Sequence, residues 1–250
     1  MATSSALPVV TLFYGFNQKV VSALKAAGKL VLFQVGTLEE ARRVTSAGGD
    51  GVIVQGMEAG GHIRGNERLA DLLPKVREAL PNHLVVGAGG VHDRASARTC
   101  RLLGADAVCS GTRFLASPES SAHAAYKQRL VDGCSTVLTN LFGVGWRDPH
   151  RVLKNGAIEK WCDDLGREPA WLSLAHKLTR PLSKFPGERG GAAIAMVARQ
   201  SLRRPLYTPS CLTVEMREDL VEIAALYAGE CVSEIKGLQS AAKTVGDLAS

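Results

Sequence analysis

The chain has 250 residues, of which 46% are hydrophobic and 22% are charged. This composition is typical of globular proteins and excludes collagen-like and low-complexity chains, and the longest apolar runs fall short of the roughly 20 residues that a membrane span requires. The six cysteines form no C-x-x-C pair and no Cys/His metal spacing. We therefore expect free thiols, a cytoplasmic location without a signal peptide or a membrane partner, and no metal site.

The net charge of +6 comes from one part of the chain, because the stretch from Leu141 to Pro205 holds 12 basic and 6 acidic residues. A nucleic-acid-binding surface would need a continuous basic helix, or aromatic residues interleaved with Lys and Arg. The stretch has neither pattern, so no nucleic-acid partner is expected. We interpret it as a solvated basic face, with attraction of small anionic ligands as the alternative.

Short apolar runs alternate with amphipathic segments over the first 140 residues, which predicts strands that are each followed by a helix. Thr37 and Glu40 form a capping box at the start of the second helix, and Gly28, Gly48 and Gly104 end three helices. This repeat predicts parallel strands joined by crossover helices. The expected strands cover residues 9–13, 29–33, 51–54, 84–86, 107–109 and 137–139, and the expected helices cover residues 18–27, 38–47, 69–80, 94–103 and 118–131.

The pattern changes after Leu141, where six prolines interrupt the sequence and further helices are expected over residues 214–227 and 240–248. We therefore expect a partial βα-barrel core with the ligand site over residues 1–142. A helical and loop-rich segment over residues 143–250 is expected to pack on this core, within one domain. Periodicity alone leaves an open parallel sheet and an incomplete barrel as equal alternatives.

The first candidate site is the segment 55–62, Gln-Gly-Met-Glu-Ala-Gly-Gly-His, which directly follows a predicted strand. Ligands bind at the carboxyl ends of strands in parallel α/β folds. Gly60 and Gly61 would let the backbone approach a flat ligand closely, and His62 titrates near neutral pH and can accept a proton. The alternative is a glycine turn with a surface histidine. The other five histidines, His150 among them, have no comparable setting and are expected to be ordinary.

Two further glycine-rich segments follow consecutive strands: residues 86–90, Val-Gly-Ala-Gly-Gly, and residues 110–113, Ser-Gly-Thr-Arg. Backbone amides in such loops, with the Thr112 hydroxyl as a further donor, predict a phosphate-binding cradle. The chain has no Walker A motif and no G-x-G-x-x-G after its first strand, which disfavours a P-loop or a Rossmann fold.

The three motifs, in this order, resemble the nitronate monooxygenase family, whose members are FMN-dependent (β/α)8 barrels. The resemblance continues through Thr139-Asn140-Leu141-Phe142 and Leu226-Tyr227-Ala228-Gly229 and covers nearly the whole chain. It implies His62 as the catalytic base. It implies FMN contacts at Gln55, Gly60, Gly61, Gly89 and Gly90, and phosphate binding at Cys109, Ser110, Gly111 and Thr112.

The chain departs from the family in two places. The family barrel normally opens with two further βα units, so the resemblance implies an α/β fold of the TIM-barrel type that is N-terminally incomplete, with about six parallel strands. The family often has Gln where this chain has Glu230.

The resemblance implies oxidation of alkyl nitronates by O2 to carbonyl compounds and nitrite, with FMN as the redox group. His62 would remove the α-proton from a neutral nitroalkane. One alternative is the flavin-dependent enoyl-acyl-carrier-protein reductase of bacteria, which shares the Glu-Ala-Gly-Gly-His and Gly-Thr-Arg-Phe motifs. The other is a truncated, non-catalytic remnant that binds flavin weakly or not at all.

Overall fold

The computed structural model describes residues 6–143, 148–179 and 197–249. The chain divides into two compact units, the first made of residues 1–59, 63–110 and 247–250 and the second of residues 60–62 and 111–246. The main boundary therefore falls between Ser110 and Gly111, and the division that the sequence predicts after residue 142 lies inside the second unit. Residues 180–196 of the basic stretch lie outside the described residues.

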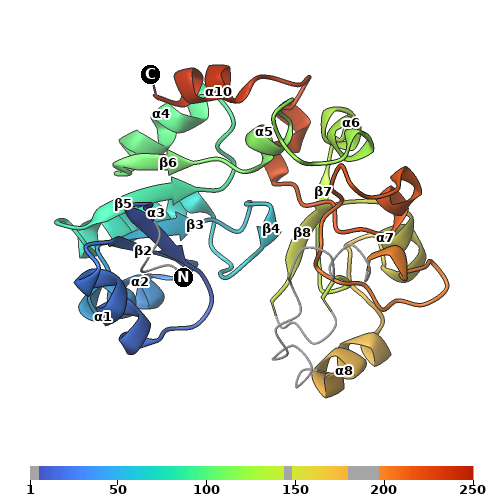
Figure 1. The fold of residues 1–250 in the computed structure, drawn as a ribbon, viewed down its shortest axis with the longest axis horizontal. Coiled ribbons are helices and arrows are strands. Elements are labelled where there is room, and N and C mark those ends of the chain that lie inside the picture. The colour runs from blue at the N-terminus through green and yellow to red at the C-terminus, as the bar shows by residue number, and fades with distance from the viewer. Residues whose placement is uncertain (1–5, 144–147, 180–196, 250) are drawn as a thin grey trace. The chain divides into compact units, whose positions relative to one another are not determined.

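The first unit is an α/β unit with a parallel sheet of five strands, in the order β1-β2-β3-β5-β6 (Figure 1). The predicted alternation of strands and helices is confirmed here, with shifts of one or two residues at the ends. Its elements are β1 (Val9–Leu12), α1 (Gln18–Ala26), β2 (Leu30–Val35), α2 (Leu38–Ser46), β3 (Gly51–Gln55), α3 (Leu69–Ala79), β5 (Leu84–Ala88), α4 (Arg94–Leu102) and β6 (Ala107–Cys109).

The centre of this sheet is apolar on both faces, as expected for parallel strands that are covered on both sides. All five residues of β3 are buried. Ile53 packs with Leu32 and Val86 in a cluster on one face, whereas its neighbours Val52 and Val54 point to the opposite face because side chains alternate along a strand. Helices α2 and α3 contribute their buried apolar sides to the core of this unit.

Three helices of the first unit begin with side-chain caps, and at the start of α1 the Asn17 side chain accepts from the Lys19 and Val20 amides. The Thr37 hydroxyl accepts from the Glu40 amide at 3.1 Å, but the Glu40 carboxylate accepts from Gly36 rather than from Thr37, so only half of the predicted capping box forms. At the start of α4, Asp93 and Ser96 form both halves of the box. These caps satisfy amides that the first helical turn leaves without partners.

Two aspartates repeat one structural device in the sheet. Asp50 precedes β3 and accepts a hydrogen bond from the Val31 amide at 2.7 Å. Asp106 precedes β6 and accepts one from the Val85 amide at 2.8 Å, while Arg77 forms an ion pair with it. In each case the carboxylate ties the start of one strand to the start of its neighbour, which helps to set the strand register.

The second unit contains a three-stranded antiparallel sheet in the order β4-β8-β7. Its elements are β4 (Gly61–His62), α5 (Thr112–Leu115), α6 (Ala124–Asp132), β7 (Thr136–Thr139), β8 (His150–Leu153), α7 (Gly156–Trp161), α8 (Ala170–Thr179) and the 3₁₀ helices η2 (Glu218–Glu222) and η3 (Glu230–Glu234), with α10 (Ala241–Ala249) ending in the residues assigned to the first unit.

The strand predicted at residues 137–139 exists as β7, but it runs antiparallel to β8 in this second sheet. The number of parallel strands among the described residues is therefore five rather than about six. Parallel pairing needs a crossover of a dozen or more residues, and the connection from Thr139 to His150 is shorter than that. The short connection instead returns the chain as an antiparallel neighbour, with Thr139 opposite His150.

The helix predicted over residues 214–227 is wrong: only the short 3₁₀ helix η2 forms there. The run from Ile223 to Leu226 is apolar at every position and buried at every position, so it lacks the solvent-facing side of an amphipathic helix. It runs through the core as an irregular segment, and the Leu226 carbonyl accepts from the Leu153 amide at 2.8 Å.

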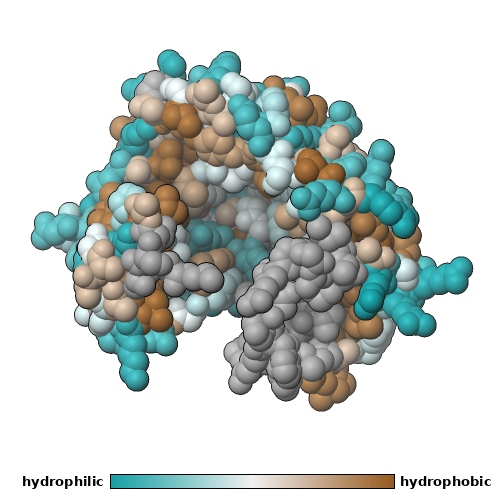
Figure 2. Space-filling view, viewed as in Figure 1, coloured by the Kyte–Doolittle hydropathy of each residue, from teal (hydrophilic) through white to brown (hydrophobic). Residues whose placement is uncertain are grey.

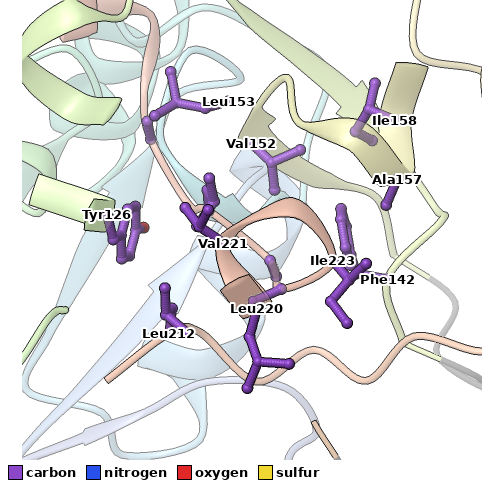
Figure 3. Close-up of a cluster of buried hydrophobic side chains, with 14 of the residues drawn as sticks. Tyr126, Phe142, Val152, Leu153, Ala157, Ile158, Leu212, Leu220, Val221 and Ile223 are labelled. Atoms are coloured by element: carbon purple, nitrogen blue, oxygen red, sulfur yellow. The ribbon is translucent and has the colours of Figure 1, made fainter. Parts of the chain in front are cut away.

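The core of the second unit is one large apolar cluster drawn from α6, β8, α7, η2 and the segments around them. Figure 3 shows its side chains gathered around η2, with Tyr126 of α6 on one side of the cluster and Ile158 of α7 on the other. The buried Asn155 amide donates to the Val221 and Ala224 carbonyls at 2.9 Å each, which satisfies backbone acceptors inside this apolar region.

Helix α8 packs on one side only. Its Leu172 is fully buried in the apolar cluster, whereas Trp171, Leu174 and Leu178 are exposed. Figure 2 shows hydrophobic colour over this helix at the lower edge of the view. Within the described ranges, no helix combines the length and apolar character needed to span a membrane.

Candidate functional site

The first unit brings several predicted site residues to one edge of its sheet. Gln55 ends β3 and pairs in register with Ala88 at the end of β5, and Ala88 pairs with Cys109 at the end of β6. The loops that follow these neighbouring strands carry Gly89, Gly90 and Ser110. Adjacent loops at the carboxyl edge of a parallel sheet, as the sequence predicts, are therefore present.

The loops after β5 and β6 are joined directly. The Ser110 hydroxyl donates to the Val91 carbonyl at 2.7 Å, which fixes one loop against the other. This bond uses the hydroxyl hydrogen of Ser110, so its backbone amide is the donor left for a ligand. Among the described residues, the amides of Gly89, Gly90 and Ser110 have no backbone acceptor.

Gly89 and Gly90 lie at this edge of the first unit, whereas Gly111 belongs to the second unit. Gly89 and Gly90 have φ angles of 123° and 70°, in the region that only glycine adopts without strain. Gly111, at the start of α5, has an ordinary φ of −107°, and a Cβ added there would meet no atom within 4 Å. The space beside the Gly111 backbone is therefore empty, and a side chain at this residue would occupy it.

The side chain of Gln55 is nearly fully buried, and its carbonyl oxygen accepts from the Arg64 amide at 3.2 Å. Arg64 in turn forms an ion pair with Glu40 and lies over the ring of Tyr14, 4.8 Å from its centroid. Arg64 was not predicted from the sequence, and Glu40 was predicted only as part of a capping box. Together they hold the orientation of Gln55 at the end of β3.

Glu58, inside the Glu-Ala-Gly-Gly-His motif, was not predicted to have a role and has a structural one. Its buried carboxylate accepts from the Leu69 amide at 3.0 and 3.2 Å. Arg68, the residue before α3, provides no side-chain cap, so Glu58 takes that place. This motif glutamate therefore stabilises the start of α3.

In the second unit, Gly60 and Thr112 contact the same backbone segment. A Cβ on Gly60 would lie 2.7 Å from the Ala228 carbonyl carbon and the Gly229 amide. The Thr112 hydroxyl accepts from the Gly229 amide at 2.9 Å and also bonds to the Cys231 thiol. Both of these interactions are made within the protein, and phosphate binding by Thr112 stays a prediction that its backbone amide could also serve.

His62 lies in β4, which pairs with β8 so that His62 stands opposite His150. The two imidazole centroids are 4.2 Å apart, and the ring of Tyr227 lies 5.8 Å from that of His62. His62 is half-buried and His150 is fully buried. The sequence analysis expects His150 to be an ordinary histidine. Its position beside His62 depends on strand β8, which the sequence did not predict.

Burial lowers the pKa of His62, an effect that the negative charge of Asp148 partly opposes. A lowered pKa favours the neutral imidazole at neutral pH. His62 is therefore in the protonation state that a general base requires.

The sequence model of the nitronate monooxygenase family matches residues 2–229. The chain belongs to the nitronate monooxygenase family. This is the family that the three glycine-rich motifs resemble, and it is a family of oxidoreductases.

Several known proteins are similar to this family member. A nitronate monooxygenase of Pseudomonas aeruginosa is 45% identical over 120 residues, which are 44% of this chain and 33% of the relative. The (3aS,4S,5R,7aS)-5-hydroxy-7a-methyl-1-oxo-octahydro-1H-indene-4-carboxyl-CoA dehydrogenase of Mycobacterium tuberculosis is 37% identical over 150 residues, which are 58% of this chain and 41% of the relative. The structure of a nitroalkane oxidase from Streptomyces ansochromogenes has a TM-score of 0.71 and 32% identity, and the match covers 99% of this chain and 64% of that one.

The chain therefore spans less than two thirds of the length of each of these proteins. The match to the nitroalkane oxidase extends over nearly the whole chain and supports the predicted fold class, an α/β fold of the TIM-barrel type. The five parallel strands of the described residues are fewer than the eight of a complete (β/α)8 barrel.

In this member of the nitronate monooxygenase family, Glu230 has a structural role. The Glu230 carboxylate lies 3.2 Å from the guanidinium of Arg151, whose side chain is almost completely buried. Arg151 also donates to the Thr136 hydroxyl at 3.3 Å. A negative charge at residue 230 therefore compensates a buried positive charge on β8, next to His150.

Proposed function

We propose that this chain binds FMN and acts as a nitronate monooxygenase, oxidising alkyl nitronates with O2 to carbonyl compounds and nitrite. Its family membership supports this reaction class. The observation that carries the proposal is the joined pair of loops after β5 and β6, where small residues leave backbone amides at one sheet edge. A cytoplasmic location is part of the proposal.

The proposed FMN contacts follow from the residue types. Backbone amides at the two joined loops would bind the phosphate, because amides in such loops favour negative charge. The flavin, when bound, supplies the redox chemistry. Thr112 would contribute through its backbone, since its hydroxyl is used elsewhere. The proposed phosphate residues are Gly89, Gly90, Cys109, Ser110, Gly111 and Thr112, and the proposed ring contacts are Gln55, Gly60 and Gly61.

His62 is the proposed catalytic base. Its neutral imidazole would accept the α-proton of a nitroalkane: the C–H bond breaks, an N–H bond forms on His62, and the electron pair remains on the substrate as the nitronate anion. The imidazolium that results would then hold the anion by a charge-assisted hydrogen bond. A nitronate supplied as the anion needs only this second role.

Binding of FMN to Gly111→Ala tests the cradle. This substitution is expected to leave the fold intact, because φ is ordinary and the space around Cβ is empty, while the new methyl group lies in the proposed phosphate site. Gly237→Ala is the matched control, since a Cβ there also meets nothing within 4 Å. We expect FMN affinity, measured by flavin fluorescence, to fall at least tenfold in Gly111→Ala only. Equal FMN affinities in the two variants would contradict the proposed phosphate cradle.

Turnover separates the proposed activity from its alternatives. The proposal predicts O2-dependent nitrite release from a nitronate without NADH. Reduction of bound FMN by NADH in the absence of a nitronate would instead favour the flavin-dependent enoyl-acyl-carrier-protein reductase. A protein that FMN cannot reconstitute would be the non-catalytic remnant.

A further inference from the structure

We propose that His150 is a positioning residue for His62, and that Tyr227 holds His150 in one tautomer for this purpose. This inference rests on the proposed function of His62 as a base. Nothing in the sequence pattern around His150 indicates such a role. It arises from three aromatic rings that the second unit brings together: His62 on β4, His150 on β8 and Tyr227 on the segment before η3.

Packing against His150 limits the movement of the His62 ring. Antiparallel pairing places His62 and His150 opposite each other, with ring centroids 4.2 Å apart and ring planes inclined by 58°. The ring of Tyr227 stacks on that of His150 at 5.9 Å, with the planes inclined by 17°. Because His150 is fully buried, its ring has little freedom to move. The His150 ring therefore limits the orientations of the half-buried His62 ring. It also excludes water from one side of the His62 ring.

The hydrogen bonds of the Tyr227 hydroxyl determine which ring nitrogen of His150 carries a hydrogen. The Tyr227 hydroxyl donates its single hydrogen to the Pro209 carbonyl. The same oxygen lies 3.4 Å from His150 Nδ1, so in this contact it can only accept. The neutral His150 therefore carries its hydrogen on Nδ1 and a lone pair on Nε2. A carbonyl on a neighbouring segment thus sets the tautomer of the ring that packs against His62.

The titratable groups beside His62 affect its protonation state. Among the described residues, the titratable groups beside His62 include His150 on β8, Tyr227, and Asp148 just before β8. In its neutral form, His150 adds no positive charge beside His62 and does not oppose the proton that His62 receives. Burial by these rings lowers the pKa of His62, and Asp148 opposes that effect. The arrangement therefore keeps His62 uncharged before the reaction and accommodates the imidazolium after it.

The test compares His150→Asn, which opens space beside His62, with His150→Phe, which keeps an uncharged ring there. The pKa of His62 is measured by NMR titration of its ring protons in protein without flavin. We expect it to rise toward the ordinary value of about 6.5 in His150→Asn and to stay low in His150→Phe. Tyr207→Phe is the control and should leave the pKa of His62 unchanged. Tyr207 is also a buried tyrosine of the second unit that donates to a carbonyl. An unchanged His62 pKa in folded His150→Asn overturns the proposal.

Kinetics provide a second readout. A neutral nitroalkane needs the base, whereas a preformed nitronate does not. We expect His150→Asn to lower kcat/KM for the nitroalkane at least tenfold more than for the nitronate, and His150→Phe to restore most of the ratio. An equal loss on both substrates indicates general structural damage and contradicts a positioning role. If the parent protein turns over neither substrate, the proposed function fails, and the NMR titration still decides the inference.

Tyr227→Phe is the milder variant, should His150→Asn fail to fold. It removes one oxygen and keeps the stacked ring. We expect the ¹⁵N shifts of His150 to change from those of an Nδ1–H ring to those of a tautomer mixture. Unchanged ¹⁵N shifts would overturn the role assigned to Tyr227.

Discussion

Glu230 Oε1 lies 3.2 Å from Nη2 of Arg151, and the two side chains form an ion pair of which the arginine is almost completely buried. We expect Glu230→Gln to lower the free energy of unfolding by about 1–2 kcal/mol, because a buried guanidinium loses its counter-charge while the partly exposed position admits some water. Urea denaturation at pH 7 measures the change.

Glu234→Gln is the control for this pair, because it removes the same charge from an exposed position in η3. Similar stabilities for the two variants would show that the ion pair contributes nothing specific. The comparison also tests whether glutamine, which the family often has at this position, is compatible with Arg151.

His62→Asn is expected to retain FMN binding and to lose turnover of neutral nitroalkanes by about a hundredfold or more, because general-base catalysis contributes on this scale. Turnover of a preformed nitronate should fall much less. His123→Asn is the matched control, since His123 caps α6 through its side chain and an asparagine can also cap a helix. If His62→Asn oxidises nitroalkanes at the parental rate, the assigned role is wrong.

Asp106 gives a pH dependence of known sign. The hydrogen bond from the Val85 amide lowers its pKa, slight burial opposes this, and Arg77 lowers it further. A carboxylate with a lower pKa in the folded than in the unfolded protein stabilises the fold above the unfolded pKa of about 4, and this contribution disappears as the pH falls through the folded value. Asp106→Asn should therefore be less stable than the parent at pH 7, with a smaller difference at pH 2.

Denaturant unfolding at both pH values measures this difference. Asp164→Asn, at an exposed position, is the control and should show no such pH dependence. A constant stability gap between parent and Asp106→Asn across the pH range would assign the effect to packing instead of charge.

Thr112→Val and Thr112→Ser separate the hydroxyl of Thr112 from its methyl group. Valine leaves the buried Gly229 amide without its acceptor, so we expect a loss of about 1–3 kcal/mol in unfolding free energy. Serine keeps the acceptor and should lose less than half of that. Thermal or urea unfolding provides the measurement, with Thr99→Val as an exposed control. Equal losses in the valine and serine variants would mean that the methyl group, not the hydroxyl, matters.

The sequence predicted the first unit well, because its information there is local. Runs such as Gly51–Gln55 are apolar at nearly every position, which fits a strand covered on both faces, and glycines such as Gly48 and Gly104 mark helix ends with positive φ angles of 96° and 105°. The adjacency of the loops after β5 and β6 also followed, since consecutive parallel strands place their carboxyl ends at one edge.

The second unit could be predicted less well, because its structure depends on contacts between distant segments. Strand β8 has no alternation that distinguishes it, and its four residues are all buried between β4 and β7. The setting of His150 could not be predicted for the same reason, because its ring contacts are with His62 and Tyr227, which are far apart in the sequence. Arg64 and Glu40 likewise become neighbours only when β2 and β3 pair.

The two antiparallel pairs between β4 and β8 assign Gly60–His62 to the second unit, although the chain on both sides of these residues belongs to the first. An N-terminal fragment ending at Ser110 would therefore carry the imidazole without the strand that supports it. Cutting the chain at one position therefore cannot separate the second unit together with His62, the proposed proton acceptor. Restoring activity from fragments would require both pieces.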